Sequence, residues 1–421
     1  MNEIILMLII LTITIILFVT EKIPIPFTAL IAALAVYLFG IIDTDTFVGG
    51  LTNEVVLLIG GMFIIGGALF QTGVAGKVGA LITKYAKTEQ QFLTVLLIIA
   101  VPFSMFLSNT STVAVMLPIV TLVADKMGYS RSKLLIPIAF VTSLVGMLTL
   151  IGTTSNLAVQ SVILEAGLQG FRFFEFAWVG VPLVFFGIIY LLTIGRRLLP
   201  DLGPREISED KKHQTYDFSG WNYKQVVAVA VLVLVIISMM LEAVTGVPLY
   251  ISALIGAIVL ISTRTINEKQ AYQTIDLSTL ILLAAMIPVA AAIEASGLGQ
   301  LIADAVIGLI GDANSPVLLI TIVFFITVLL GAVMSNTATA LLMAPIAILI
   351  AANLGVSPYP LLMTVVMAAA ASYLTPISTP PNTMVYVPGN YTFMNYVVVG
   401  VPLVMIQYFV CIAVVPWVWP F

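Results

Sequence analysis

Long apolar stretches, separated by short polar connections, make up most of this chain of 421 residues. A helix of about 17 to 25 predominantly apolar residues is long enough to cross the hydrocarbon core of a bilayer. The sequence therefore predicts an all-α polytopic membrane protein. The predicted spans are residues 4–20, 24–42, 54–73, 134–164, 176–195, 222–243, 248–263, 276–296, 359–388 and 396–416.

Two further apolar regions, residues 91–124 and 315–353, contain a polar cluster in the middle. The first cluster begins SNTSTVAVMLPIV at Ser108, and the second begins SNTATALLMAPIA at Ser335. Polar residues are costly in hydrocarbon and persist there where they face protein, water or a ligand. A helical hairpin that enters and leaves on one side of the membrane places each cluster at its tip. We therefore predict two re-entrant hairpins.

The positions of the basic residues support this arrangement. With both regions as hairpins and the polar linker 199–221 in the cytoplasm, Arg172 is the single one of the 16 basic residues on the outer side. The positive-inside rule requires such a bias. We expect both termini outside, the first hairpin entering from the cytoplasm and the second from outside. Residues 4–20 lack the cationic start of a signal peptide and are interpreted as a span.

The two halves of the chain resemble each other beyond the hairpins. LIGTTSNL, beginning at Leu150, corresponds to TPISTPPNT, beginning at Thr375, and VGVPLV occurs at Val179 and again at Val399. Each half contains an odd number of spans, so the second half must run upside down relative to the first. Inverted repeats with interrupted helices are typical of secondary transporters.

These observations predict two inverted five-helix repeats, each with a re-entrant hairpin and a broken helix. Repeat 1 is expected at residues 1–198, the cytoplasmic linker at 199–221 and repeat 2 at 222–421. The predicted parts are scaffold helices in 4–73 and 222–296, hairpins 91–124 and 315–353, broken helices 134–164 and 359–388, and helices 176–195 and 396–416.

The hairpin tips contain no charged residue but many hydrogen-bonding groups. The returning half-helices are expected to begin near Thr110 and Thr337, where unpaired amide N–H groups and the helix dipole favour an anion. One such cluster is more typical of helix capping, but two clusters at equivalent positions favour a binding site. Its donors and acceptors would come from Ser108, Asn109, Thr110, Ser335, Asn336 and Thr337.

Two segments are expected to interrupt helices, namely GTTSN from Gly152 to Asn156 and STPPN from Ser378 to Asn382. Glycine weakens a helix, and proline cannot continue one. The freed carbonyls, the Ser and Thr hydroxyls and the Asn oxygens are hard ligands that suit Na⁺ in broken-helix transporters. A simple kink is the alternative, but the pairing of the two segments favours an ion site.

Paired Ser-Asn-Thr hairpins, followed by a GT-type break in one half and an STPPN break in the other, resemble the divalent anion–sodium symporter (DASS) family of the ion transporter superfamily. The resemblance covers essentially the whole chain. It implies a homodimeric elevator-type transporter of the cell membrane that carries a di- or tricarboxylate or sulfate with Na⁺. Family members typically have a further helix before the first repeat, whereas the first predicted span here belongs to the repeat itself.

The resemblance also implies which residues bind the ions. Gly331 stands where Ser104 stands in the first hairpin, so the second cation site is expected to be weaker or to use water. One sodium site would use Ser104, Ser108, Asn109, Gly152 and Asn156, and the other Asn336, Ser378, Thr379 and Asn382. The substrate would contact Asn109, Thr110, Asn336, Thr337, Thr379 and Pro380.

Composition excludes several other classes of protein. Hydrophobic residues make up 61% of the chain and charged residues 9%, whereas a soluble domain is about a quarter charged. No basic, aromatic segment indicates nucleic-acid binding. The single cysteine, Cys411, excludes an internal disulfide and a cysteine-ligated metal site. The single histidine, His213, lies in the linker, which argues against an intramembrane hydrolase and a His-based metal site.

Two other transport functions remain as alternatives. One is an efflux permease for arsenite or another oxyanion, and the other is a sodium-independent carboxylate transporter that is proton-coupled or acts as an exchanger. Proton coupling is an alternative because Glu54, Glu242 and Glu294 lie near span ends, and carboxylates inside a membrane are commonly functional. Near the outer ends of spans, however, a solvated carboxylate is the simpler interpretation.

Overall fold

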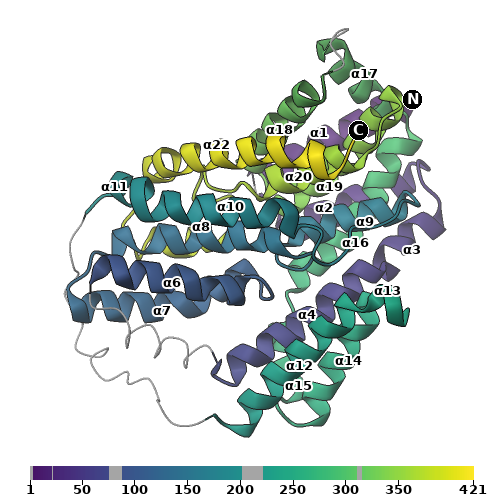
Figure 1. Ribbon diagram of the computed structural model, residues 1–421. Coiled ribbons are helices and arrows are strands. Elements are labelled where there is room, and N and C mark those ends of the chain that lie inside the picture. The colour runs from purple at the N-terminus through teal and green to yellow at the C-terminus, as the bar shows by residue number, and fades with distance from the viewer. Residues whose placement is uncertain (1–2, 21, 75–87, 202–220, 311–314) are drawn as a thin grey trace.

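The computed structural model of this chain describes residues 3–20, 22–74, 88–201, 221–310 and 315–421 (Figure 1). Within these ranges all regular secondary structure is helical, as the sequence predicted. Eight of the described helices are long and apolar enough to cross a membrane. Most of the predicted linker, including His213, lies outside the described residues.

One group of helices packs around α2, α4, α14 and α16. Helix α2 packs against α16 and α4 against α14, so the first quarter of the chain lies beside the start of the second half. Figure 1 shows this group at the right and lower right, in purple and green. Its members are α1 (Glu3–Thr20), α2 (Ile25–Leu38), α3 (Thr44–Thr52), α4 (Glu54–Gln71), α12 (Tyr223–Met240), α13 (Glu242–Thr245), α14 (Leu249–Ser262), α15 (Glu268–Thr274) and α16 (Leu277–Ala295).

The second group contains the hairpins and the broken helices. Nearly every residue of α8 and α20 is buried, so these two helices form its centre. Its members are α6 (Glu89–Ser104), α7 (Asn109–Met127), α8 (Leu135–Val145), α9 (Thr154–Glu165), α10 (Ala177–Tyr190), α11 (Arg196–Leu198), α17 (Leu298–Ile310), α18 (Pro316–Gly331), α19 (Asn336–Leu354), α20 (Tyr359–Ala370), α21 (Pro380–Tyr386) and α22 (Phe393–Val418).

The two predicted hairpins are present. Helices α6 and α7 form the first hairpin, and α18 and α19 form the second. Figure 1 shows α6 and α7 at the left and the α17–α18 arm at the upper right. Each returning helix ends at a glycine in the left-handed region, Gly128 at φ 71° and Gly355 at φ 65°, where a residue with a Cβ would be strained. The similarity of the two halves therefore includes the C-terminal caps of the returning helices α7 and α19.

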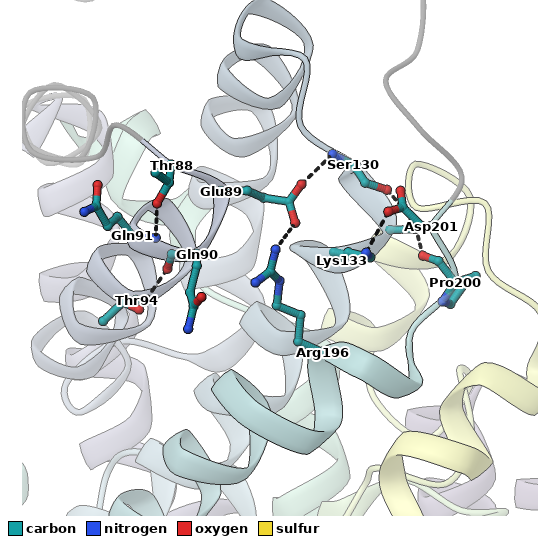
Figure 2. A network of polar contacts seen from close by, with 11 residues as sticks. Thr88, Glu89, Gln90, Gln91, Thr94, Ser130, Lys133, Arg196, Pro200 and Asp201 are labelled. Atoms are coloured by element: carbon teal, nitrogen blue, oxygen red, sulfur yellow. Dashed lines mark hydrogen bonds and ion pairs between the residues drawn. The ribbon is translucent and has the colours of Figure 1, made fainter.

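An ion-pair network fixes the base of the first hairpin (Figure 2). Glu89, the first residue of α6, pairs with Arg196 of α11 at 2.7 Å and accepts a hydrogen bond from the Ser130 N–H at 3.3 Å. Nearby, Lys133 pairs with Asp201 at 2.6 Å. Partly exposed pairs of this kind contribute about 0–1 kcal/mol each, so the network positions the hairpin more than it stabilises the fold.

The sequence missed short helices, among them α3, α15 and α17, and it placed the end of α2 too late. Helices α3 and α15 occupy equivalent places in the two halves, and α17 packs against α19 and α16. They are too short or too polar to show the apolar runs that predict spans. Helix α2 ends at Leu38 rather than at residue 42, because Gly40 adopts φ 75° and turns the chain.

Candidate functional site

The tips of both hairpins are capped by the serine of the Ser-Asn-Thr cluster. Helix α7 begins at Asn109, and the Ser108 Oγ accepts a hydrogen bond from the N–H of the third helical residue at 3.2 Å. Helix α19 begins at Asn336, and the Ser335 Oγ accepts the equivalent bond at 3.3 Å. The capping interpretation therefore holds for the serines, and the asparagine side chains are left for other partners.

The helix interruptions lie slightly upstream of their predicted positions. The non-helical segments cover residues 149–153 and 371–379, because α9 begins at Thr154 and α21 at Pro380. The prediction that STPPN is itself unwound was wrong at its second half, as was the same prediction for GTTSN. Proline is favoured as the first residue of a helix, where its missing N–H has no partner to lose. Pro380 thus starts a helix rather than ending one.

One asparagine from each half holds its interruption in place. Asn156 is fully buried, and its Nδ2 donates to the carbonyl oxygens of Gly146 at 3.0 Å and Thr149 at 2.8 Å. Asn382 is also fully buried and donates to the equivalent pair of carbonyls in the second half at 2.6 and 3.0 Å. These amides satisfy backbone groups that lost their helical partners. The side-chain Oδ1 of each asparagine points elsewhere.

In the first half, five buried side-chain oxygens find no hydrogen-bond partner within the described part of the chain, those of Ser104, Asn109, Tyr129, Ser143 and Asn156. Three of them belong to predicted sodium residues, namely Ser104, Asn109 and Asn156. A Cβ placed on Gly146 would lie 3.0 Å from the Gly152 carbonyl oxygen and 3.3 Å from the Asn109 Oδ1, so the tip touches the interruption. Unpaired buried acceptors are costly. An uncharged set of oxygens is suited to a hard cation such as Na⁺.

The second half has a similar arrangement, in which the two equivalent asparagines are joined by two threonines. Oxygens of Asn336, Thr339, Thr379 and Asn382 are buried and lack partners among the described residues. The Asn336 Nδ2 donates to the Ser372 Oγ at 2.7 Å, which fixes the amide and leaves its Oδ1 unpaired. The donor set again consists of uncharged oxygens, and it fits a bound sodium ion as well as the first set does.

A cavity of about 620 Å³ lies between the tips, the interruptions and helix α16. The charged residue in its wall is Asp276, which caps α16 by accepting from two backbone N–H groups at 3.0 and 3.3 Å. No lysine or arginine lines this cavity in the part of the chain that the structure describes. All the residues predicted to contact substrate line it, namely Asn109, Thr110, Asn336, Thr337, Thr379 and Pro380.

Helices α7, α9 and α19 all begin at this cavity, and their first N–H groups and positive dipole ends favour an anion there. The halves cross at this point, since α19 packs against α9 and α7 packs against α21. The Thr154 Oγ1 lies 2.6 Å from the Thr337 Oγ1 and joins the first interruption to the second tip. The sequence did not identify Thr154 as a cavity residue, although it is the counterpart of Pro380.

The predicted sodium residues divide into two sets. Ser108, Gly152, Ser378 and Thr379 line the cavity together with the two tip asparagines. Ser104, Asn156 and Asn382 are buried behind its wall. The predicted sodium residues therefore lie both in the cavity wall and directly behind it.

Helices α10 and α22 each pack a glycine closely against the backbone at or just before an interruption. A Cβ on Gly180 of α10 would clash with the carbonyl oxygen of Met147, and one on Gly400 of α22 would clash with that of Tyr373. Both glycines belong to the repeated VGVPLV segment. Close packing at these positions limits how far either interruption can shift.

The carboxylates that raised proton coupling lie away from this cavity. Glu54 and Glu242 line a separate cavity of about 340 Å³ with Arg172, and Glu294 is exposed near the end of α16. Burial raises the pKa of the Glu242 carboxyl, and the neighbouring Glu54 charge adds to this effect. These three carboxylates are therefore not part of the central cavity.

Comparison with known proteins gives an independent result. The model of the citrate transporter family matches residues 15–355 and 309–421. YfbS, an uncharacterized transporter of Escherichia coli K12, is 26% identical over 100% of both chains. SdcS, a sodium-dependent dicarboxylate transporter of Staphylococcus aureus, is 25% identical over 96% of this chain and 83% of that protein. The crystal structure of the YdaH transporter of Alcanivorax borkumensis covers 96% of this chain and 97% of its own, with a TM-score of 0.60 and 13% identity.

Proposed function

This chain belongs to the citrate transporter family, and on that premise we propose that it is a sodium-coupled symporter of a divalent anion. It is a multi-pass cell-membrane transporter and not an enzyme. The anion would be a di- or tricarboxylate or sulfate. The observation that carries the proposal concerns the described residues: two groups of buried oxygens without hydrogen-bond partners adjoin one cavity that no basic side chain lines.

Charge balance supports sodium coupling. A dianion in this cavity meets helix N-termini and hydroxyls, but the charged side chain in the wall is the carboxylate of Asp276. Two unit charges 4 Å apart attract by about 4 kcal/mol at an effective dielectric constant of 20. Sodium ions at the Asn109 and Asn336 clusters would supply positive charge on both sides of the cavity. The similarity to sodium-dependent SdcS supports the same coupling.

The residues of the site would form two sodium sites. Ser104, Ser108, Asn109, Gly152 and Asn156 would hold one sodium ion, and Asn336, Ser378, Thr379 and Asn382 the other. Without sodium, the partnerless oxygens make movement of the site through the bilayer unfavourable. With sodium bound, the tips are fixed and the anion binds between them.

Transport would follow an elevator mechanism in a homodimer. The second helix group, with the hairpins, would slide against the first group as a body. Helices α12 and α14 of the first group expose large apolar side chains, among them Leu234, Ile237 and Ile258. We assign this face to contact with a second copy or with lipid. Repeat 1 (1–198) and repeat 2 (222–421) each contribute to both groups.

A thermal-shift screen of purified protein tests the function directly. Di- and tricarboxylates, sulfate and arsenite are added in sodium chloride or in choline chloride of equal ionic strength. We expect a dianion to raise the melting temperature in sodium and to leave it unchanged in choline, because a ligand stabilises only the state that binds it. Equal shifts in both salts would instead indicate proton coupling or exchange, and a shift with arsenite alone would indicate the efflux permease.

The Thr154–Thr337 pair gives a prediction about substrate affinity. Thr154→Val removes the hydroxyl and keeps the side-chain shape. A hydrogen bond to a charged partner contributes about 1.5–3 kcal/mol, so we expect KM for the anion to rise about tenfold in proteoliposome uptake. Half-saturation by sodium should change less than twofold.

Thr121→Val is the matched control for this experiment. The Thr121 hydroxyl bonds the carbonyl of Leu117 in its own helix at 2.9 Å, and Thr121 does not line the cavity. Its KM should equal that of the wild type. An unchanged KM in Thr154→Val, or an equal rise in both variants, would remove Thr154 from the substrate site.

A further inference from the structure

The two halves differ at one position where the cation sites should match. Ser104 is the last residue of α6, and its buried Oγ has no hydrogen-bond partner among the described residues. Its counterpart in the second hairpin is Gly331, the last residue of α18, which has no side chain to offer. The second cluster therefore lacks the oxygen that the first cluster receives from its entering helix.

A second difference between the halves occurs one turn into the returning helices. Thr112 and Thr339 are equivalent threonines, each the fourth residue of its helix. The Thr112 Oγ1 donates to the carbonyl oxygen of Ser108 at 3.2 Å, the usual bond for a helical threonine. The Thr339 side chain is 0% exposed, and its Oγ1 has no partner within the described residues.

The Thr339 side chain borders the space that Gly331 leaves open. A Cβ placed on Gly331 would lie 3.9 Å from both the Oγ1 and the Cγ2 of Thr339, and 3.7 Å from the carbonyl oxygen of Ala369. Thr339 also lies three residues after Asn336, so the two side chains share one face of α19. Helix α18 has no hydroxyl at Gly331, but α19 supplies the hydroxyl of Thr339 next to that position.

We propose that Thr339 is a ligand of the second cation site and takes there the role that Ser104 has in the first. The inference rests on the proposed sodium coupling. It replaces the expectation that the second site is weak or completed by water. In this site the Thr339 Oγ1 and the Asn336 Oδ1 would provide neutral oxygens from α19, and the Asn382 Oδ1 would provide a third. Gly331 keeps the space clear, and the site remains uncharged.

The test measures sodium binding without transport. Sodium is titrated into purified protein, and the melting temperature reports the affinity. We expect Thr339→Val to lower the apparent sodium affinity at least tenfold and to make the titration less steep, because one of two sites is impaired. Thr339→Ser keeps the hydroxyl and should retain wild-type affinity within threefold. Thr112→Val is the matched control and should behave as the wild type.

A rescue separates the hydroxyl from packing. Gly331→Ser, combined with Thr339→Val, puts a hydroxyl back into the same space from α18, and the absence of any atom within 3.7 Å of the added Cβ leaves room for it. We expect the double variant to regain most of the lost affinity. Wild-type affinity in Thr339→Val, or an equal loss in Thr339→Ser or Thr112→Val, overturns the assignment of Thr339. A wild-type protein that shows no sodium response overturns the proposed function as well, which distinguishes the two failures.

Discussion

We expect that replacing Asn336 by alanine abolishes anion uptake and that Asn109→Ala has the same effect. Each asparagine begins a returning hairpin helix, lines the central cavity and carries a buried Oδ1 without a partner among the described residues. On the proposed function, the truncation would remove a cation ligand and a substrate contact at once. Because hydrogen bonds to charged groups contribute about 1.5–3 kcal/mol each, we expect uptake into proteoliposomes to fall at least 100-fold.

Asn353→Ala is the matched control on the same helix as Asn336. The Asn353 Nδ2 donates to the Asp304 Oδ1 at 3.2 Å on an exposed surface, far along α19 from the tip. We expect its uptake to equal that of the wild type, and all three variants to elute from size exclusion as the wild type does. If Asn109→Ala and Asn336→Ala both transport normally, the assignment of the site is wrong.

Gly152→Ala is expected to eliminate sodium-dependent stabilisation. A Cβ at this position would lie 2.5 Å from the Gly146 carbonyl oxygen and 2.9 Å from its Cα. Both atoms are backbone, so the interruption itself has to shift, and forcing a methyl group into a packed region costs about 1–3 kcal/mol. The shift displaces the carbonyls beside Asn109. We therefore expect the apparent affinity for sodium to fall at least tenfold in a thermal-shift titration.

Gly49→Ala provides the control for the added methyl group. Gly49 lies within α3, and a Cβ there would meet no atom within 4 Å. Alanine also favours a helix over glycine by about 1 kcal/mol, so this variant should be as stable as the wild type or slightly more stable. Wild-type sodium affinity in Gly152→Ala would show that the approach of Gly146 and Gly152 does not shape a cation site.

Much of the fold follows from the repeat pattern. The duplicated Ser-Asn-Thr clusters predicted both hairpins, and the structure confirms that each cluster forms a tip at one shared cavity. The spans and the helical class follow from apolar length, which the bilayer dictates. Helices α3 and α15 escaped prediction because their sequences carry no long apolar run. The roles of sodium, the homodimer and the elevator motion stay predictions.

The errors within the site have a common cause. The sequence marked Pro380 as a helix breaker, but whether a proline ends or starts a helix depends on where the backbone N–H groups find partners. Asn156 and Asn382 were predicted only as oxygen ligands of a cation. Their Nδ2 groups also donate hydrogen bonds to backbone carbonyls at the interruptions. Thr154 was not assigned to the cavity because its position depends on its contact with Thr337 of the other half. Thr339 was missed because its surroundings depend on how α19 packs against α18, which no local pattern encodes.

The paired amide bonds of Asn156 and Asn382 have a kinetic consequence. Each of these two amides donates two hydrogen bonds to backbone carbonyls at its interruption. On the proposed function, the cation sites would thus be preorganised, and binding would need little rearrangement of the backbone. Ion exchange would then be limited by water access and by dehydration of the entering cation, and we expect it to be faster than the transport cycle.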